Sequence, residues 1–262
     1  MSFPYKHVLL IGATSGIGAA LANTFIAHNI KVTAVGRRAD RLEAFVSQHG
    51  PELASSMVFD ISNVSKASSF AAQALKSYPT IDCLFLNAGM VRWYNFAEPK
   101  SVDIGGFFEE MNTNFTALVA LTYAFLPYFL EAKGERSIVY TGTHIGIVPA
   151  ASMPAYSASK AALDSFTMCL RQQLSVTNTK VIYVSPPLVQ SELHDVQMGE
   201  KGRKMGMPAD EFAEATYSEL TKGTENVIIG TIGGSSVEQF VEIVDKREEA
   251  FQRLVELLKT LH

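Results

Sequence analysis

The chain has 262 residues, of which 47% are hydrophobic and 18% charged, with a formal net charge of −4. This length suits one large α/β domain or two small ones, and the composition allows a sizeable buried core. No basic run or stripe favours nucleic-acid binding. The two cysteines, Cys83 and Cys169, are too few for a disulfide framework and fit a reducing, cytoplasmic setting.

Targeting and membrane segments are not expected. Gly12, Gly16 and Gly18 interrupt the first apolar run, so it does not resemble a signal peptide. No other stretch approaches the roughly 18 uncharged apolar residues that a membrane span needs, so no membrane association is predicted. No metal site is predicted either.

Short apolar runs alternate with longer helical patterns along the whole chain. Strands are predicted at 7–11, 31–35, 57–59, 83–86, 137–140, 180–184 and 227–229. Helices are predicted near 17–29, 39–49, 64–77, 101–131 and 154–177. The strands show little polar alternation, which is typical of parallel strands buried on both faces. The pattern predicts an α/β fold with a doubly wound parallel sheet, in a single domain.

Three glycines, Gly12, Gly16 and Gly18, follow the first predicted strand and open the first helix. Strand, glycine loop and helix in this order are what a dinucleotide-binding loop requires. Missing side chains let the backbone turn tightly and approach a pyrophosphate, and the helix N-terminus supplies amide donors. The sequence therefore predicts a dinucleotide site here.

The residues after the second strand indicate which dinucleotide is bound. An acidic residue there would accept hydrogen bonds from a ribose 2′-hydroxyl. The chain instead has Arg37 and Arg38, with no carboxylate before Asp40. A guanidinium suits a 2′-phosphate, so NADP(H) is favoured over NAD(H), unless both arginines are merely solvated surface charges. Asp60, after the third strand, is expected to contact adenine or to cap the strand end.

Tyr156 and Lys160 lie four residues apart in a stretch that predicts a helix. Residues at this spacing share one face, and Pro154 suits the first turn, where the dipole favours negative charge. A phenol has a pKa near ~10, which a neighbouring cation lowers. Lys160 would then make Tyr156 a general acid or base near neutral pH. Taken alone, the pair also fits an ordinary surface helix.

These motifs together resemble those of the short-chain dehydrogenase/reductase family, in its short single-domain branch. The resemblance runs from residue 6 to residue 193 and weakens in the last quarter. It implies a Rossmann-like fold, a single domain over 1–262 and a nicotinamide cofactor. The matching residues are Gly12, Gly16, Gly18, Asp60, Asn87, Ala88, Gly89, Asn114, Tyr156 and Lys160.

The resemblance also implies the roles of individual residues. The catalytic tetrad would be Asn114, Thr143, Tyr156 and Lys160, with Tyr156 as proton donor and Asn114 holding a water of a proton relay. In this family the helices that correspond to 101–131 and 154–177 pair across a two-fold axis, which implies a homodimer or homotetramer. Cofactor contacts are expected from Gly12, Thr14, Ser15, Gly16, Ile17, Gly18, Arg37, Arg38, Asp60, Asn87, Ala88, Gly89, Tyr156, Lys160, Pro186, Val189 and Ser191.

The chain departs from the family pattern at three positions. Thr143 stands where serine is usual, which keeps the hydroxyl but adds a methyl group that restricts χ1. Ile11 replaces a usual threonine before the glycine loop. Pro187 replaces a usual glycine and stiffens the loop expected beside the nicotinamide. None of these changes removes a catalytic group.

The last quarter of the chain has two further features. Residues 192–225 are rich in glycine and methionine and are predicted to form a mobile substrate lid. An apolar stripe in the C-terminal stretch predicts a helix packed on the body, with partner binding as the alternative. The substrate walls are expected from 90–96, 144–148, Met153, 188–190 and 192–217. Their side chains suggest an apolar or aromatic ketone, aldehyde or secondary alcohol.

Two other classes of function stay open at this point. One is a non-catalytic NADP-binding redox sensor or regulator, which would not need Tyr156 and Lys160 together. The other is a different Rossmann-like enzyme such as a methyltransferase, for which the Tyr-Lys pair has no use. The residues favour an NADP(H)-dependent oxidoreductase that acts on a small carbonyl compound or alcohol.

Overall fold

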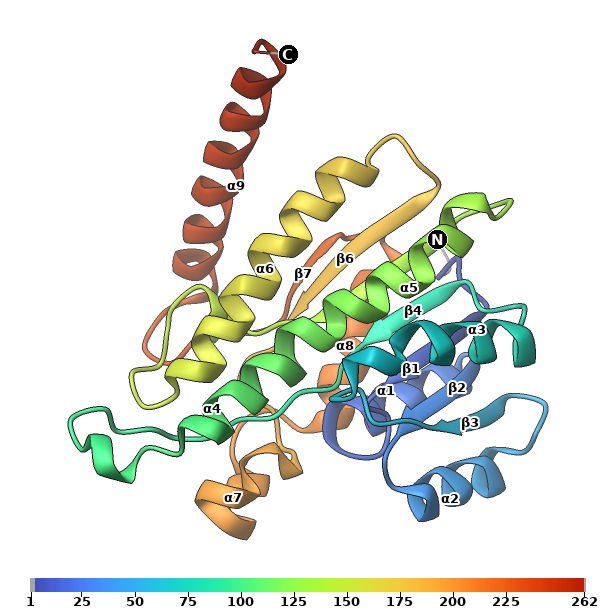
Figure 1. The fold of residues 1–262 in the computed structure, drawn as a ribbon, viewed down its shortest axis with the longest axis horizontal. Coiled ribbons are helices and arrows are strands. Elements are labelled where there is room, and N and C mark those ends of the chain that lie inside the picture. The colour runs from blue at the N-terminus through green and yellow to red at the C-terminus, as the bar shows by residue number, and fades with distance from the viewer. Residues whose placement is uncertain (1–2, 262) are drawn as a thin grey trace.

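The computed structural model describes residues 3–261, apart from the side chain of Val196. Its centre is a seven-stranded sheet in the order β3-β2-β1-β4-β5-β6-β7, in which every neighbouring pair is parallel. Helices cover both faces of the sheet (Figure 1). The doubly wound parallel fold predicted from the sequence is confirmed. The strands are β1 (His7–Ile11), β2 (Lys31–Gly36), β3 (Ala54–Val58), β4 (Cys83–Leu86), β5 (Arg136–Thr141), β6 (Thr179–Ser185) and β7 (Asn226–Ile228).

Successive residues of a strand point to opposite faces of the sheet, and both faces are buried. In β1, Leu10 belongs to the core under α1 (Gly16–Ala27), α2 (Ala39–His49) and α8 (Ala209–Thr221). Its neighbour Leu9 belongs to the core under α3 (Ala67–Ser77), α5 (Ala117–Glu131) and α6 (Pro154–Leu174). The near-continuous apolar strands of the sequence are therefore explained by helices on both sides.

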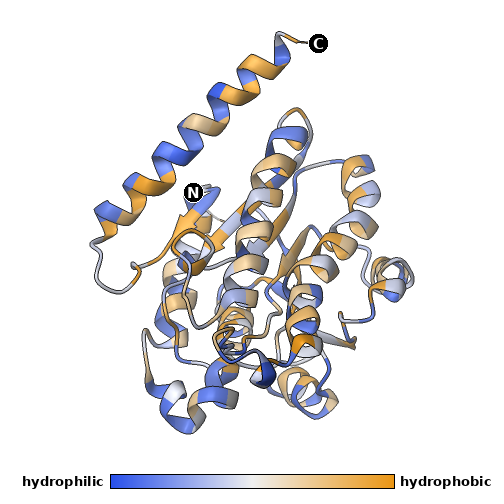
Figure 2. Ribbon diagram, turned by 60° about the vertical axis from the view of Figure 1, so that its left-hand side comes forward, coloured by the Kyte–Doolittle hydropathy of each residue, from blue (hydrophilic) through white to orange (hydrophobic). Residues whose placement is uncertain are grey.

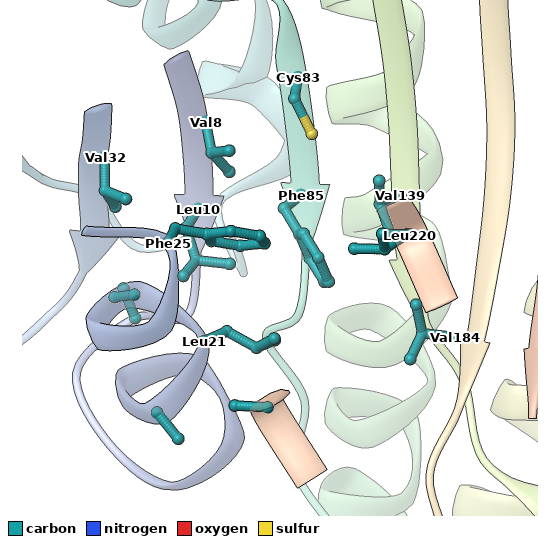
Figure 3. Close-up of a cluster of buried hydrophobic side chains, with 14 of the residues drawn as sticks. Val8, Leu10, Leu21, Phe25, Val32, Cys83, Phe85, Val139, Val184 and Leu220 are labelled. Carbon is teal, nitrogen blue, oxygen red and sulfur yellow. The ribbon is translucent and has the colours of Figure 1, made fainter. Parts of the chain in front are cut away.

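Figure 3 shows the first of these two cores, with Leu21 and Phe25 of α1 directed at the apolar residues of the sheet. Leu220 of α8 closes the same core and is 3% exposed. Burying a large apolar side chain contributes roughly 1.5–3 kcal/mol, so α8 is a structural part of the domain.

The helix before β5 is one continuous stretch, Ile104–Glu131, with an irregular turn in its middle. It consists of α4 (Ile104–Met111), a π-helical segment at Asn112–Thr116 and α5. By length and composition this stretch could cross a membrane, contrary to the sequence prediction, but Leu118, Phe125 and Phe129 are buried in the second core. The length and apolar composition of this stretch are equally those of a helix that packs in a protein core.

The predicted lid over 192–225 is too long. Residues 209–221 form α8, whose Phe212 and Ala213 are fully buried against the core. The segment before α8 contains only short turns, including α7 (Asp195–Met198) and a 3₁₀ helix at Gly199–Lys204. The prediction extended too far because α8 directly follows a glycine-rich stretch, and for residues 192–207 the lid stays a prediction.

The C-terminal helix α9 (Val237–Lys259) is also different from the prediction. Only Phe240, near its start, is buried, and the far half of the helix extends beyond the body (Figure 1). Hydrophobic and hydrophilic residues alternate along this extended half (Figure 2). Its leucines at 254, 257 and 258, and Leu261 just beyond its end, are between 46% and 69% exposed. The helix therefore packs on the body only through its first turns.

Candidate active site

A cleft of about 470 Å³ opens at the carboxyl ends of the strands. Its walls come from the residues that follow β1, β2, β3, β4 and β6, from the end of β5 and from the first turns of α6. The strand order reverses direction between β1 and β4, and ligands of open α/β sheets bind at such a switch point. The cleft is thus the place where this fold is built to take a ligand.

The glycine loop forms one wall of the cleft, and each glycine is required by close contacts. Gly12 and Gly16 have φ values of +86° and +51°, which favour glycine. A Cβ atom on Gly12 would lie 2.7 Å from the backbone of Ala88, and one on Gly18 would lie 2.0 Å from the carbonyl oxygen of Gly12. Side chains here would fill the loop, so its backbone is free to approach a ligand.

Asn87 connects the three central strands beneath the cleft. Its Nδ2 donates to the carbonyl oxygen of Gly12 at 3.1 Å, and its Oδ1 accepts from the Thr141 hydroxyl at 2.9 Å. The ends of β1, β4 and β5 are therefore held at a fixed spacing. Thr141 was not predicted as a site residue, because a threonine at a strand end carries no motif.

At the end of the cleft formed by β2, two arginines share one carboxylate. Arg38 donates to Thr14 and Ser15 of the glycine loop and forms an ion pair with Glu192 at 2.8 Å. Arg41 forms a second ion pair with the same carboxylate at 2.9 Å. These charges hold the pKa of Glu192 below its usual range, despite the opposing effect of partial burial.

Arg37 differs from this group. It lines the cleft, is exposed, and makes no side-chain hydrogen bond to any residue within 3–261. The predicted pair of arginines is thus divided into one that is engaged with the glycine loop and one that is free. Arg41 and Glu192 were missed by the sequence reasoning, although Glu192 directly follows the predicted contact Ser191.

Tyr156 and Lys160 meet at the opposite end of the cleft, on the first turns of α6. Both side chains are buried, and both line the cleft. The Lys160 Nζ donates to the carbonyl oxygen of Thr141 at 2.8 Å and lies 5.8 Å from the centre of the Tyr156 ring. The pair shares one helix face, as the four-residue spacing predicts.

The acid–base properties of this pair are different from the sequence prediction. Burial, and secondarily the charge of Glu110, raises the pKa of Tyr156 above its usual value. Burial lowers the pKa of Lys160 to about 8. The ammonium group bonds to Thr141 rather than to the phenol, so the lowering of the tyrosine pKa expected from the sequence is not seen in this structure.

Asn114 lies in the π-helical segment and fixes the loop that follows β4. Its amide accepts from the backbone N–H of Met90 and donates to the Met90 carbonyl oxygen, both at 2.9 Å. It also donates to the Ser159 hydroxyl at 3.1 Å, and Ser159 in turn donates to the carbonyl oxygen of Tyr156. A π-helical turn is frequent at functional sites, and here it places one amide between two walls of the cleft.

Thr143 is 6% exposed and begins a short turn, where its Oγ1 accepts a hydrogen bond from the backbone N–H of Ile145 at 3.3 Å. Its hydroxyl hydrogen is left to donate. The neighbouring His144 belongs to the predicted substrate wall at 144–148. It is 1% exposed, packs on Phe240 with ring centres 4.3 Å apart, and so belongs to the interior.

Most of the predicted site residues line the cleft. Gly18, Asn114, Thr143 and Val189 do not contribute to its wall, and the first two support it from behind. Of the predicted substrate wall, Met90, Val91 and Arg92 line the cleft, whereas Trp93 and Phe96 are about half exposed outside it. The predicted cofactor-binding and catalytic residues that line the cleft are Gly12, Thr14, Ser15, Gly16, Ile17, Arg37, Arg38, Asp60, Asn87, Ala88, Gly89, Tyr156, Lys160, Pro186 and Ser191.

Comparisons with known proteins agree with this geometry. The chain is 29% identical over 262 residues to the uncharacterized oxidoreductase DltE of Bacillus subtilis, covering 99% of both chains. It is 29% identical over 216 residues to the NADP-dependent 3-hydroxy acid dehydrogenase YdfG of Salmonella typhimurium, covering 82% of this chain and 86% of the relative. The similarity to DltE spans both the glycine loop and the Tyr-Lys helix.

Two solved structures have the same fold. One is the closed form of a serine dehydrogenase complexed with NADP⁺, with a TM-score of 0.77, 26% identity and coverage of 88% of this chain and 98% of that chain. The other is a Burkholderia phymatum short chain dehydrogenase/reductase in complex with NAD, with a TM-score of 0.78, 21% identity and coverage of 87% and 90%.

The sequence profile described as short chain dehydrogenase matches residues 6–201. This segment is well over half of the chain and contains the cleft, the glycine loop, Asn114 and the Tyr156–Lys160 helix. The chain therefore belongs to the short-chain dehydrogenase family of oxidoreductases.

Proposed function

We propose that this protein is an NADP(H)-dependent oxidoreductase that transfers a hydride between the nicotinamide and a ketone, aldehyde or secondary alcohol. The observation that carries the proposal is the placement of Tyr156 and Lys160 at the end of a cleft that begins at a glycine loop. A phenol and an ammonium group buried together at a ligand cleft are the parts of an acid–base site.

The residues of the cleft fit a dinucleotide. The positive φ values of Gly12 and Gly16 and the N-terminus of α1 provide a loop with free backbone donors. Asp60 accepts from the backbone N–H of Ser62 at 3.0 Å and still lines the cleft, so one of its oxygens is available for adenine. When bound, a reduced nicotinamide supplies the hydride.

The protein's own residues then manage the proton. Tyr156 lines the cleft, where its hydroxyl would donate a proton to the carbonyl oxygen of the substrate. Thr143 does not line the cleft itself but follows Gly142, which does, and its hydroxyl hydrogen would polarise the same oxygen. Lys160 Nζ and Asn114 Oδ1 flank Gly89, where a Cβ atom would lie 3.7 and 3.3 Å from them. Lys160 would return a proton to Tyr156, and the Asn114 oxygen would accept a hydrogen bond from a water of that relay. Alcohol oxidation follows the same path in reverse.

The preference for NADP(H) is supported by charge at the β2 end of the cleft. Arg37 lines the cleft, and the residues directly after β2 include no carboxylate before Asp40, while the Glu192 carboxylate at this end is paired with Arg38 and Arg41. YdfG is NADP-dependent by name and the serine dehydrogenase structure holds NADP⁺, whereas the Burkholderia structure holds NAD. Since relatives of both kinds occur, the arginines are the main support for the preference.

The substrate is proposed to be an apolar or aromatic carbonyl compound. Met90 and Val91 line the cleft after β4, and Leu193 lines it from the start of the 192–207 segment. Gln197 donates to the carbonyl oxygen of Val91 at 3.3 Å, so this segment reaches across to the β4 loop. We propose that residues 192–207 act as the lid, and faster hydrogen exchange there without ligand than with NADPH plus a substrate analogue would support this.

Self-association is proposed as well. The apolar side chains Ile104, Phe108 and Tyr123 on α4 and α5 are between 52% and 76% exposed. Exposed apolar surface of this kind is typical of an interface, and a symmetric dimer or tetramer would cover it. Light scattering at micromolar concentration should give a dimer or tetramer, and a monomer would contradict the proposal.

The proposed function is tested by two measurements. Fluorescence titration with NADPH, NADH and S-adenosylmethionine should show NADPH as the tightest ligand. A panel of ketones and aldehydes monitored for loss of NADPH should then contain at least one substrate. Tight binding of NADPH with no turnover on any compound would favour a redox sensor, and binding of S-adenosylmethionine alone would favour a methyltransferase.

A further inference from the structure

A carboxyl group is buried beside the catalytic helix, and the motifs of the family do not assign it a role. Glu110 of α4 is 0% exposed. Its Oε2 accepts a hydrogen bond from the Tyr94 hydroxyl at 3.3 Å, whereas its Oε1 has no hydrogen-bond partner in the described part of the chain. A buried carboxyl group with one unpartnered oxygen is unusual, because most buried polar atoms are hydrogen-bonded.

The helix geometry places Glu110 near Tyr156. The stretch containing α4 and α5 runs beside α6 in the same direction (Figure 1). Asn114 faces Ser159 across this contact, with 3.1 Å between Nδ2 and Oγ. About one turn earlier on each helix stand Glu110 and Tyr156, because residues three or four apart share a helix face. Burial is the main cause of the raised pKa of Tyr156, and the charge of Glu110 raises it further.

A structural role does not explain this carboxyl group. Burial raises the pKa of Glu110 to about 7, so near neutral pH the protein holds an incompletely solvated charge in its interior. An apolar side chain of similar size would avoid the cost of burying this charge. Strongly perturbed carboxyl groups beside an active site are more typical of function than of packing.

We infer that Glu110 is a positioning residue that keeps the proton on Tyr156 and so holds the enzyme in its proton-donating form. This inference rests on the proposed function. In carbonyl reduction the substrate carbon gains the hydride and the substrate oxygen gains the Tyr156 proton, which leaves an alcohol and a tyrosinate. A negative charge behind the phenol opposes loss of that proton before the carbonyl compound is bound.

Within residues 3–261, few other titratable groups lie near Glu110. Tyr94 and Arg92 approach it from the loop after β4, and Tyr156 stands on the neighbouring helix α6 with Lys160 one turn further along. The Arg92 guanidinium is engaged by the Gly106 carbonyl oxygen at 2.7 Å and by Glu109 at 2.6 Å. Glu110 and Tyr156 are therefore expected to titrate as a coupled pair, in which ionisation of the first delays ionisation of the second.

The test is the pH profile of NADPH-dependent carbonyl reduction and of the reverse oxidation in Glu110→Gln. Removing the charge should lower the pKa of Tyr156 in the complex. The part of each pH profile, for reduction and for oxidation, that reports tyrosine ionisation should therefore move to lower pH by about one unit. Each of these transitions should also span a narrower pH range, because the coupling to Glu110 is lost. Unchanged limbs in a variant with wild-type cofactor affinity would overturn the inference.

A second measurement does not depend on turnover. Infrared difference spectra of the protein without cofactor should show a protonated carboxyl band that disappears at about pH 7 and is absent in Glu110→Gln. In Tyr94→Phe this band should persist to higher pH, because the donor that stabilises the carboxylate is removed. Glu131→Gln, an exposed glutamate at the far end of the same helical stretch, should leave both the band and the pH profile unchanged. If no such band exists in the wild type, the inference fails.

The two proposals can fail separately. A wild-type protein that reduces no carbonyl compound would contradict the proposed function while the infrared band still reports Glu110. A wild-type protein that is active, with a pH profile that Glu110→Gln does not move, would contradict the role of Glu110 alone.

Discussion

The two ends of the cleft place charged groups in opposite surroundings. At the β2 end, Arg38, Arg41 and Glu192 form ion pairs while remaining between 30% and 40% exposed. At the α6 end, Tyr156, Lys160 and Glu110 are between 0% and 8% exposed. Exposed ion pairs are weak and exchange easily with a ligand, whereas buried groups have strongly shifted pKa values. The first end is thus suited to binding and the second to proton transfer.

The largest expected effect is at the buried end. Tyr156→Phe should reduce turnover by roughly 10²–10⁴-fold, because a general acid is lost. Binding of NADPH should change little, since the ring that packs beside Lys160 is kept. Steady-state kinetics and fluorescence titration of the same preparation check both statements. Wild-type turnover by the Phe variant would show that another group donates the proton.

The next effect is at the exposed end. Arg37→Ala should weaken NADPH binding by about 10- to 100-fold, as expected for loss of a charge-assisted hydrogen bond, and should leave NADH binding unchanged. Titration with both cofactors checks this difference. Equal loss for the two cofactors, or no loss for NADPH, would mean that Arg37 is a solvated surface charge.

The third effect concerns the free energy of unfolding, and it contrasts the buried carboxyl group of Glu110 with the exposed one of Glu131. In the folded protein Glu110 keeps its proton up to about pH 7, whereas its ordinary pKa is 4.5. Its contribution to stability is therefore lost as the pH rises from about 4.5 through about 7. Relative to the wild type, Glu110→Gln should become more stable over this window, by on the order of 1–3 kcal/mol, and the difference should be constant above it.

Chemical denaturation of both proteins at about pH 5 and about pH 8 measures this difference. Glu131→Gln, which changes the same side chain at an exposed position, is the matched control and should show none of it. A destabilised Glu110→Gln at the higher pH would show that the carboxylate is a structural partner after all.

The smallest effect is expected at Glu192. Glu192→Gln should strengthen NADPH binding up to about fivefold, because the exposed ion pairs with Arg38 and Arg41 that it removes are worth about 0.2–1 kcal/mol each. Isothermal titration at low and high salt checks this, since salt weakens the wild-type ion pairs and should reduce the gain. Weaker binding in the variant would mean that Glu192 itself contacts the cofactor.

The sequence predicted the parts of the molecule whose conformation depends on residues close together in the chain. Gly12 and Gly16 need positive φ values that few other residues adopt, and the spacing of Tyr156 and Lys160 follows from helix geometry. β3 begins at Ala54, three residues before the predicted start, because Ser55 and Ser56 carry no apolar signal in an edge strand. Local pattern is therefore sufficient for most of the fold and for the motif residues.

Features that depend on contacts between distant segments could not be predicted. Glu110 appears as one of two adjacent glutamates on a helix, and nothing in the sequence distinguishes it from exposed Glu109. The pairing of Arg41 with Glu192 joins residues 151 positions apart. The apolar stripe of α9 predicts an amphipathic helix. How much of that helix packs on the body depends on where the chain starts α9 after leaving β7, and local sequence does not encode this.

The central claim is that the buried end of the cleft performs hydride and proton transfer. Its most direct test uses NADPH carrying deuterium at the transferable position of the nicotinamide, with an aromatic ketone that is turned over in the panel. Mass spectrometry should find one deuterium on the carbinol carbon of the alcohol formed by the wild type, and no alcohol from Tyr156→Phe. An alcohol without deuterium, or labelled alcohol formed equally well by the Phe variant, would contradict the account.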